Sequence, residues 1–144
     1  MNSVDTNAVL NRLLVIHKRS LPVYLSYAVP WSGGGDEAAA DTLAQIANDH
    51  KQMADRLEEV ILENGGIVER GGFPMAFTSL HFLAIGFLVN KLIEDQKRAI
   101  EEVGECVDQL SLSPATQAVA QEALGEAKGH LESLKELGTK ASEA

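Results

Sequence analysis

Three histidines and one glutamine stand out in this sequence because each interrupts an otherwise apolar helical pattern. They are His17, His50, Gln96 and His130. A polar group buried without a partner costs about 1–3 kcal/mol, so four such groups require a shared explanation. Three imidazoles form a suitable ligand set for one Zn, Cu, Ni or ferrous ion, with water or the glutamine in the fourth position. The alternative is a hydrogen-bonded layer in which the imidazoles, the amide and a buried water satisfy one another.

Two further side chains are candidate ligands for the same ion. Met53 offers a soft thioether one turn after His50, although a methionine in an apolar stripe is usually core packing. Glu126 precedes His130 by four residues on one helix face, so it would orient that imidazole or join a single-metal site. The predicted metal site therefore consists of the three histidines, with Gln96, Met53 and Glu126 as additional candidates.

Helical periodicity runs through the chain in four segments, and no segment sustains the two-residue alternation of a β-strand. The predicted helices span about residues 6–28, 36–64, 79–110 and 114–137. Their boundaries are set by proline and glycine signals at Pro30, Gly65-Gly66, Ser113-Pro114 and Gly138. Pro22 lies inside the first predicted helix and should kink it just after His17, because proline lacks the backbone donor. The fold class is therefore all-α.

Connection lengths predict how these helices are arranged. The first and last pairs are joined by short turns, whereas residues 67–78 form a connection long enough to run the length of the molecule. This pattern is typical of an antiparallel four-helix bundle with one crossover, formed by residues 1–144 as a single domain. The four interrupting side chains lie about 16–18 residues from their turns, or roughly 25 Å along the helices. They are therefore expected to meet in one central layer.

The composition excludes several other classes of function. The chain of 144 residues contains 12 Lys and Arg against 21 Asp and Glu, a net charge of −9, so nucleic acid and anionic membranes are unfavourable partners. Cys106 is the only cysteine, which rules out an intrachain disulfide and a thiolate metal cage. No secretory signal is recognisable, and the apolar run of residues 82–89 is too short to span a bilayer. We therefore expect a cytoplasmic protein.

Several stretches resemble ferritin-like proteins of the bacterioferritin and rubrerythrin type. The run from Leu57 to Gly66 (LEEVILENGG) is similar to the end of their second helix, where Leu-x-x-x-Ile-Leu-x-x-Gly-Gly recurs. Residues 10–14 (LNRLL) resemble the start of their first helix, and Ala99-Ile100 resembles the pair that follows the ligand of their third helix. The long crossover matches as well. The resemblance covers nearly the whole chain and implies the same bundle fold.

In that family, two iron ions are held by a Glu from each of two helices and a Glu-x-x-His from each of the other two. The resemblance places at these positions His17, His50-x-x-Met53, Gln96 and Ala127-x-x-His130. All four carboxylates are thus replaced, and two iron ions lack the bridging anions that would offset their charge. The nearest acids, Asp49, Glu94 and Glu126, are expected on other helix faces than the residues that replace the carboxylates. A di-iron centre is therefore unfavourable.

Three functions remain open from the sequence. The first is a ferritin-like bundle without ferroxidase activity, which acts as a binding or structural protein and holds at most one transition-metal ion. The second is an iron- or oxygen-handling redox enzyme with an unusual ligand set. The third is a structural interaction module that forms a homodimer. A homodimer is expected because residues 82–89 are apolar around the whole helix, so either the crossover or a second subunit must cover them.

Overall fold

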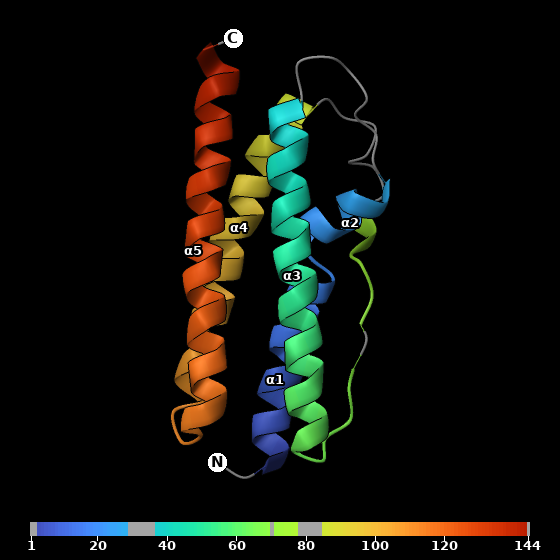
Figure 1. Ribbon diagram of the computed structural model, residues 1–144, viewed down its shortest axis with the longest axis vertical. Helices are drawn as coiled ribbons and strands as arrows, with labels where there is room; N and C mark the ends of the chain where they lie inside the picture. The colour runs from blue at the N-terminus through green and yellow to red at the C-terminus, as the bar shows by residue number, and fades with distance from the viewer. Residues whose placement is uncertain (1–2, 29–36, 70, 78–84, 144) are drawn as a thin grey trace.

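The computed structural model describes residues 3–28, 37–69, 71–77 and 85–143, and in this part of the chain all regular structure is helical. The helices are α1 (Ser3–Lys18), α2 (Leu21–Ala28), α3 (Glu37–Glu63), α4 (Ile85–Gln109) and α5 (Pro114–Glu143). Four of them are long and lie side by side, while the short α2 is tilted away from the bundle axis (Figure 1). The prediction of an all-α helical bundle is confirmed.

The first predicted helix, residues 6–28, is in fact two helices. α1 ends at Lys18, and Ser20 starts α2 by accepting a hydrogen bond from the backbone N–H of Val23 (3.4 Å) on its side-chain Oγ. Pro22 therefore lies in the first turn of α2, where its missing N–H removes no helical hydrogen bond. The expected kink is instead a complete break, because a capping serine two residues before the proline favours a new helix start.

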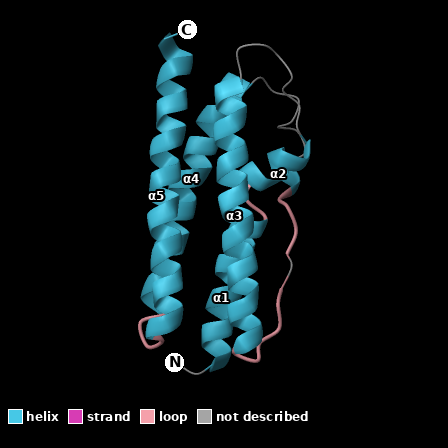
Figure 2. Ribbon diagram, viewed as in Figure 1, coloured by secondary structure: helices cyan, strands magenta, loops and turns pink. Residues whose placement is uncertain are grey.

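The long helices run in two directions. α1 and α5 run from the lower end of the molecule to the upper end in Figure 1, and α3 and α4 run the opposite way. α5 packs mainly against α4, and α1 packs mainly against α3. After α3, the chain returns from the lower end to the level of α2 as an extended crossover beside the bundle (Figure 2). The start of this crossover is set by Gly65, whose positive φ of 75° ends α3 as predicted.

One side chain of α1 fastens the crossover to the bundle. The Asn11 amide donates to the carbonyl of Ile67 and accepts from the N–H of Glu69, each over 2.8 Å. Farther along, Gly71 has a φ of 57° and passes so close to α1 that a Cβ there would lie 3.1 Å from Val15. A side chain at this glycine would therefore meet both backbone strain and a steric contact.

The last two helices differ from the predicted spans at two ends. α4 is described from Ile85, so the predicted start at residue 79 lies outside the described residues. The expected stop at Gly138 is wrong, since α5 continues to Glu143. A single glycine costs only about 1 kcal/mol inside a helix and does not end it without a further break signal. A Cβ at Gly138 would lie 3.3 Å from Ile93 of α4, so its small size suits close helix packing.

The apolar core consists of two clusters at different heights. The lower cluster is built around Leu10, Leu13, Leu14, Met53, Leu57, Ile61, Val103, Cys106 and Leu110. The upper cluster is built around Leu21, Leu25, Leu43, Ile46, Phe77, Leu88, Val89, Leu92 and Leu134. Residues 17, 50, 96 and 130 fall between the two clusters along each of the long helical segments. The core is therefore divided by one polar layer.

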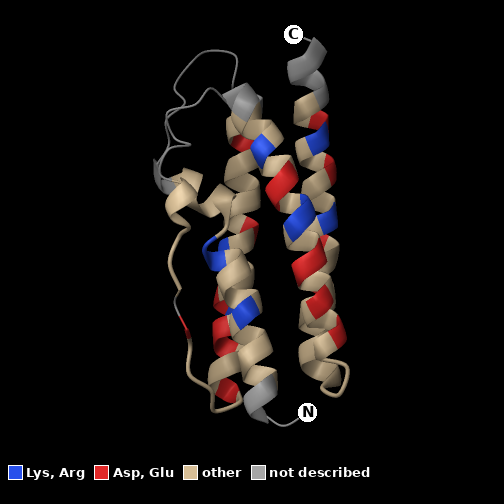
Figure 3. Ribbon diagram, turned by 180° about the vertical axis from the view of Figure 1, so that it is seen from behind, with Lys and Arg blue, Asp and Glu red and all other residues tan. Residues whose placement is uncertain are grey.

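Charged residues lie along the long helices, as Figure 3 shows, while α2 contains none. Pairs between helices include Arg12 with Glu105 at 2.7 Å and Lys18 with Glu58 at 2.6 Å. Exposed or half-exposed pairs such as these contribute about 0–1 kcal/mol each. No helix in the described part of the chain is both long enough and apolar enough to span a bilayer.

Candidate functional site

The polar layer brings together three imidazole rings in the centre of the bundle. His17, His50 and His130 come from α1, α3 and α5 and are only 4%, 7% and 8% exposed. The ring of His50 lies between the other two, with centroids 5.4 Å from His17 and 5.3 Å from His130, and both contacts are edge to face. Gln96 of α4 is 4% exposed and completes the layer. The heights counted from the turns thus correctly placed these side chains together, while their use as ligands stays a prediction.

His17 has a defined tautomer in the structure. Its Nδ1 lies 2.9 Å from the carbonyl oxygen of Leu13, which can only accept, so Nδ1 carries the proton. Burial lowers the pKa of His17 below 6.5, opposed by the Leu13 hydrogen bond and reinforced by repulsion from His130. The ring is therefore neutral at pH 7, and its Nε2 is a lone-pair acceptor.

His50 is held by the serine that starts α2. Its Nδ1 lies 2.7 Å from Ser20 Oγ, and the same oxygen caps α2. Burial lowers the pKa of His50 well below 6.5, and repulsion from His17 and His130 lowers it further. A hydroxyl both donates and accepts, so this contact allows either neutral tautomer of His50. The break between α1 and α2 thus supplies a hydrogen-bond partner to the layer.

His130 is paired with an acid that was expected to point elsewhere. Its Nε2 donates to Asp49 Oδ2 over 2.9 Å, and the Asp49 side chain is 27% exposed. The expectation of a layer without any nearby carboxylate is therefore wrong, because Asp49 reaches His130 on the neighbouring α5. His130 Nδ1 is buried and has no hydrogen-bond partner in the described part of the chain.

Gln96 has a fixed amide orientation. Its Nε2 donates to the carbonyl oxygen of Ala127 over 2.9 Å. The acceptor end of the amide, Oε1, is consequently left for another group. Gln96 also lines a pocket, as do His17 and His50.

The two additional candidates lie apart from this arrangement. Met53 is packed into the lower cluster and is 5% exposed, which agrees with a packing role. Glu126 is exposed, and the hydrogen-bond partner of His130 is Asp49 in its place. Partial burial raises the pKa of Glu126, and the nearby charge of Asp49 raises it further. Neither residue joins the histidines in the structure.

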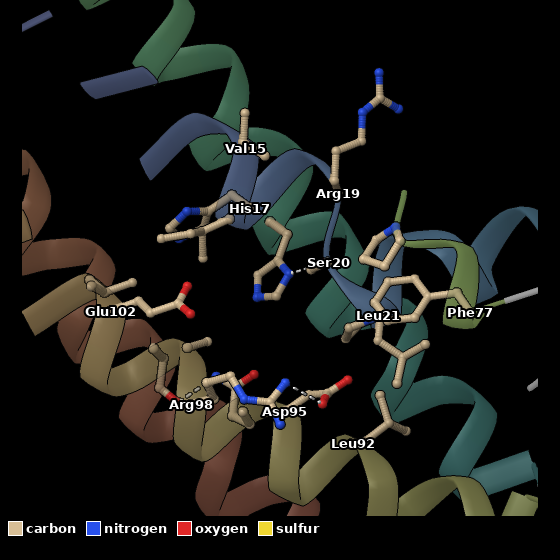
Figure 4. A pocket seen from close by; sticks show the side chains of 18 of the residues that line it. Val15, His17, Arg19, Ser20, Leu21, Phe77, Leu92, Asp95, Arg98 and Glu102 are labelled. Carbon is tan, nitrogen blue, oxygen red and sulfur yellow. Dashed lines mark hydrogen bonds and ion pairs between the residues drawn. The ribbon is translucent and has the colours of Figure 1, made fainter. Parts of the chain in front are cut away.

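A pocket of about 360 Å³ leads from the surface to the layer. Its walls come from the end of α1, the start of α2, the crossover and α4, and Figure 4 shows side chains from these elements around it. Apolar side chains dominate the walls, among them Val15, Leu21, Phe77 and Leu92. The volume is within the range of pockets that take small organic ligands, about 300–1,000 Å³.

The described side chains do not fit a di-iron centre. Asp49 is the one carboxylate bonded to the layer, and it is already engaged by His130 and by Gln45 Nε2 at 2.9 Å. Two iron ions require several carboxylate ligands, which this layer does not supply. Nor are any three His, Cys, Asp or Glu side chains in the described ranges arranged to hold a single ion as they stand.

Asp49 and Ser20 are the two residues of this site that were missed from the sequence. Asp49 is adjacent to His50, so on α3 alone it points away from the His50 side chain. It nevertheless reaches His130 on α5. The signal for Ser20 was the Ser-x-Pro spacing of residues 20–22, which is typical of a helix start. A comparison with protein-family models finds no match for this chain, and a comparison with curated protein sequences finds none either.

Proposed function

We propose that the protein is a ferritin-like bundle in which ligand binding has replaced di-iron chemistry. The helix directions and the long crossover support the ferritin-like topology, together with the similar stretches at residues 10–14 and 57–66. By the resemblance, the layer corresponds to the level at which that family holds its metals, and His17, His50, Gln96 and Ala127 stand where the family has carboxylates. Ferroxidase and peroxidase activity are therefore not proposed.

One observation supports a binding role most strongly. His130 Nδ1 is buried and has no hydrogen-bond partner in the described part of the chain. Gln96 Oε1 is an acceptor at the pocket, because the amide nitrogen of Gln96 already donates to Ala127. A buried acceptor without a donor costs about 1–3 kcal/mol, so the layer is stabilised by any group that supplies protons or positive charge. Such a group is either a metal cation or a hydrogen-bond donor.

A single transition-metal ion is the first candidate occupant, with His17, His50 and His130 as ligands. Zn, Cu, Ni and ferrous ions all accept imidazole nitrogen. The ring centroids are close enough for a modest rotation of the side chains to direct their nitrogens toward a shared ion. Asp49 would then orient His130 from behind, as carboxylates commonly do for metal-bound histidines.

Elemental analysis of the purified protein after incubation with each ion and dialysis tests this proposal. We expect one ion per chain, and its loss in His50→Ala. His81→Ala is the control, because it removes the fourth histidine, which lies outside the described residues. Two irons per chain with turnover of ferrous ion would overturn the proposal in favour of a redox enzyme. Retention of the ion in His50→Ala would exclude the proposed ligand set.

The second candidate is a purely structural layer, and the hydrogen bonds of His50 and Gln96 favour it. In that case no metal is retained by any variant, and the layer serves to fix the register of the four helical segments. The homodimer also stays a proposal, supported by the apolar residues 82–89. Leu88 and Val89 are buried within the single chain, and the other side chains of this run lie outside the description. Light scattering that gives 15.5 kDa would contradict the dimer.

A further inference from the structure

The inner end of the pocket contains one acceptor that does not depend on the state of any histidine. Gln96 is only 4% exposed, and its amide nitrogen donates to the carbonyl oxygen of Ala127 over 2.9 Å. Because a backbone group fixes the amide in this way, Oε1 is the acceptor that Gln96 offers to the pocket. A ligand that reaches this end is stabilised if it supplies one hydrogen-bond donor.

Most of the remaining wall is apolar and comes from three separate elements. Leu21 belongs to α2, Phe77 to the crossover and Leu92 to α4, and Figure 4 shows these three side chains on one side of the pocket. The ring of Phe77 is itself in contact with Tyr24, whose ring centroid lies 5.6 Å away. An apolar ligand body matches such a wall, and an aromatic ring could also meet Phe77 edge to face.

The acceptor and the apolar wall are close enough for one small molecule to reach both. Gln96 follows Leu92 by four residues on α4, and both line the pocket, so they lie on one helix face about 6 Å apart along its axis. A short link between a ring and a donor group spans such a separation.

The charged side chains of the wall favour neither sign of ligand charge. Among its described residues, three are positive and two are negative, namely Arg19, Lys91, Arg98, Asp95 and Glu102. Lys91 and Arg98 both contact Asp95, each over 3.4 Å, while Figure 4 shows the Glu102 carboxylate directed into the pocket. A charged ligand of either sign would meet like charge as well as opposite charge, and it would lose hydration in a largely apolar cavity. The best complement is therefore an uncharged molecule.

We infer that the pocket binds a small uncharged aromatic alcohol. Its hydroxyl donates to Gln96 Oε1, and its ring lies among Leu21, Phe77 and Leu92. The volume of about 360 Å³ is large enough for a molecule of this kind. This inference rests on the proposed ligand-binding role of the bundle, but it requires no metal and no particular protonation of the histidines.

An NMR titration of metal-free protein with four probes that share one ring tests the inference. 2-Phenylethanol is the expected ligand, 2-phenylethylamine and phenylacetate are its charged counterparts, and ethylbenzene lacks the donor. We expect the alcohol to bind at least about tenfold more tightly than either charged counterpart, because a charge loses hydration without a matching gain. Nuclear Overhauser effects should join the ring protons of the alcohol to Phe77 and Leu92.

Two variants separate the acceptor from the pocket as a whole. Gln96→Leu nearly keeps the side-chain volume and should weaken binding of the alcohol about fivefold without weakening that of ethylbenzene, because it removes one neutral hydrogen bond. Gln109→Leu is the matched control, at an exposed position of the same helix outside the pocket wall, and it should change neither affinity. Ala99→Phe adds a ring to a half-buried position of the wall and should block both ligands, which keeps the inference testable if Gln96→Leu does not fold.

Binding of the amine or the carboxylate as tightly as the alcohol would overturn the inference. So would unchanged affinity for the alcohol in either Gln96→Leu or Ala99→Phe, because the ligand would then lie elsewhere. A chain that retains one metal ion but does not bind the alcohol keeps the proposed metal site and loses this inference. Alcohol binding by a chain that retains no metal has the opposite outcome.

Discussion

The two apolar clusters on either side of the histidine layer are built differently. The lower cluster is formed by four long helices that continue past one another without interruption. In the upper cluster, the eight-residue α2 and Phe77 of the crossover take the place of a continued α1. Leu21, Phe77 and Leu92 of the upper cluster line the pocket, whereas the buried lower-cluster residue that does so is Val103. The pocket thus lies beside the break between α1 and α2, and more of its buried apolar wall belongs to the upper cluster than to the lower one.

The largest effect is expected from truncation in the lower cluster. Leu13 and Leu25 are both completely buried, one in α1 and one in α2. Leu13→Ala should lower the free energy of unfolding by about 2–5 kcal/mol, because it leaves a cavity between long helices. Leu25→Ala should have a smaller global effect and mainly speed amide exchange in α2, since a short helix can open locally. Urea unfolding measures the global free energy of unfolding of both variants, and hydrogen exchange measures the local opening of α2. Equal losses of global free energy in the two variants would mean that the two clusters contribute equally to stability.

Removal of the serine that starts α2 tests the link between the break and the layer. Ser20→Ala loses a helix cap and leaves His50 Nδ1 without its partner, so we expect a destabilisation of about 1–3 kcal/mol. Ser26→Ala is the control, because within the described ranges its hydroxyl donates to the carbonyl of Val23 in the same helix. Thermal unfolding compares the two variants. Equal decreases in Tm would mean that the hydrogen bond between Ser20 and His50 does not contribute to stability.

The pH dependence of stability sharpens the contrast between the layer and the clusters. The pKa values of His17 and His50 are lowered by folding, so the unfolded chain binds more protons than the folded chain below pH 6.5. Stability should be fully present above pH 6.5 and fall as the pH decreases through the lowered pKa values, by at most about 1.4 kcal/mol per pH unit for each histidine. Unfolding curves between pH 7.5 and about 4.5 measure this loss. His50→Gln should flatten the decrease, and an unchanged slope would contradict the role of His50.

The smallest effect is expected at the acid that holds His130. Asp49→Asn keeps an acceptor but removes its charge, so it should cost about 1 kcal/mol. Asp55→Asn, at an exposed position on the same helix, should be close to neutral. Chemical denaturation compares the two variants. A neutral result for Asp49→Asn would mean that the charge of Asp49 does not contribute to stability through its hydrogen bond with His130.

Much of this architecture could be predicted from the sequence because it depends on local signals. The ends of α3 and the start of α5 follow glycine and Ser-Pro patterns, and counting residues from the turns placed His17, His50, Gln96 and His130 at one height. Such counting works because antiparallel helices share a constant rise per residue. The common height of these four side chains therefore follows from the way the antiparallel helices are aligned from their turns.

The missed features depend on contacts between elements. Asp49 bonds His130 across to α5, and its own helix gives no sign of this. The pocket exists because α2 tilts away and the crossover covers the gap, and neither the tilt nor the path of an extended segment follows from hydropathy. α5 continues past Gly138 because one glycine is a weak stop signal when the surrounding residues favour a helix.

The Asn11 amide has a consequence for the size of the pocket. It donates to the carbonyl of residue 67 and accepts from the N–H of residue 69. It thus pairs with the backbone of the crossover in the way that a neighbouring strand pairs with a sheet edge. The returning chain is thereby anchored at that point, and Phe77 is positioned by the length of chain that follows the anchor. Insertions or deletions after residue 69 would then move the aromatic wall without disturbing any long helix. A change in the length of this loop would accordingly change the size of the pocket.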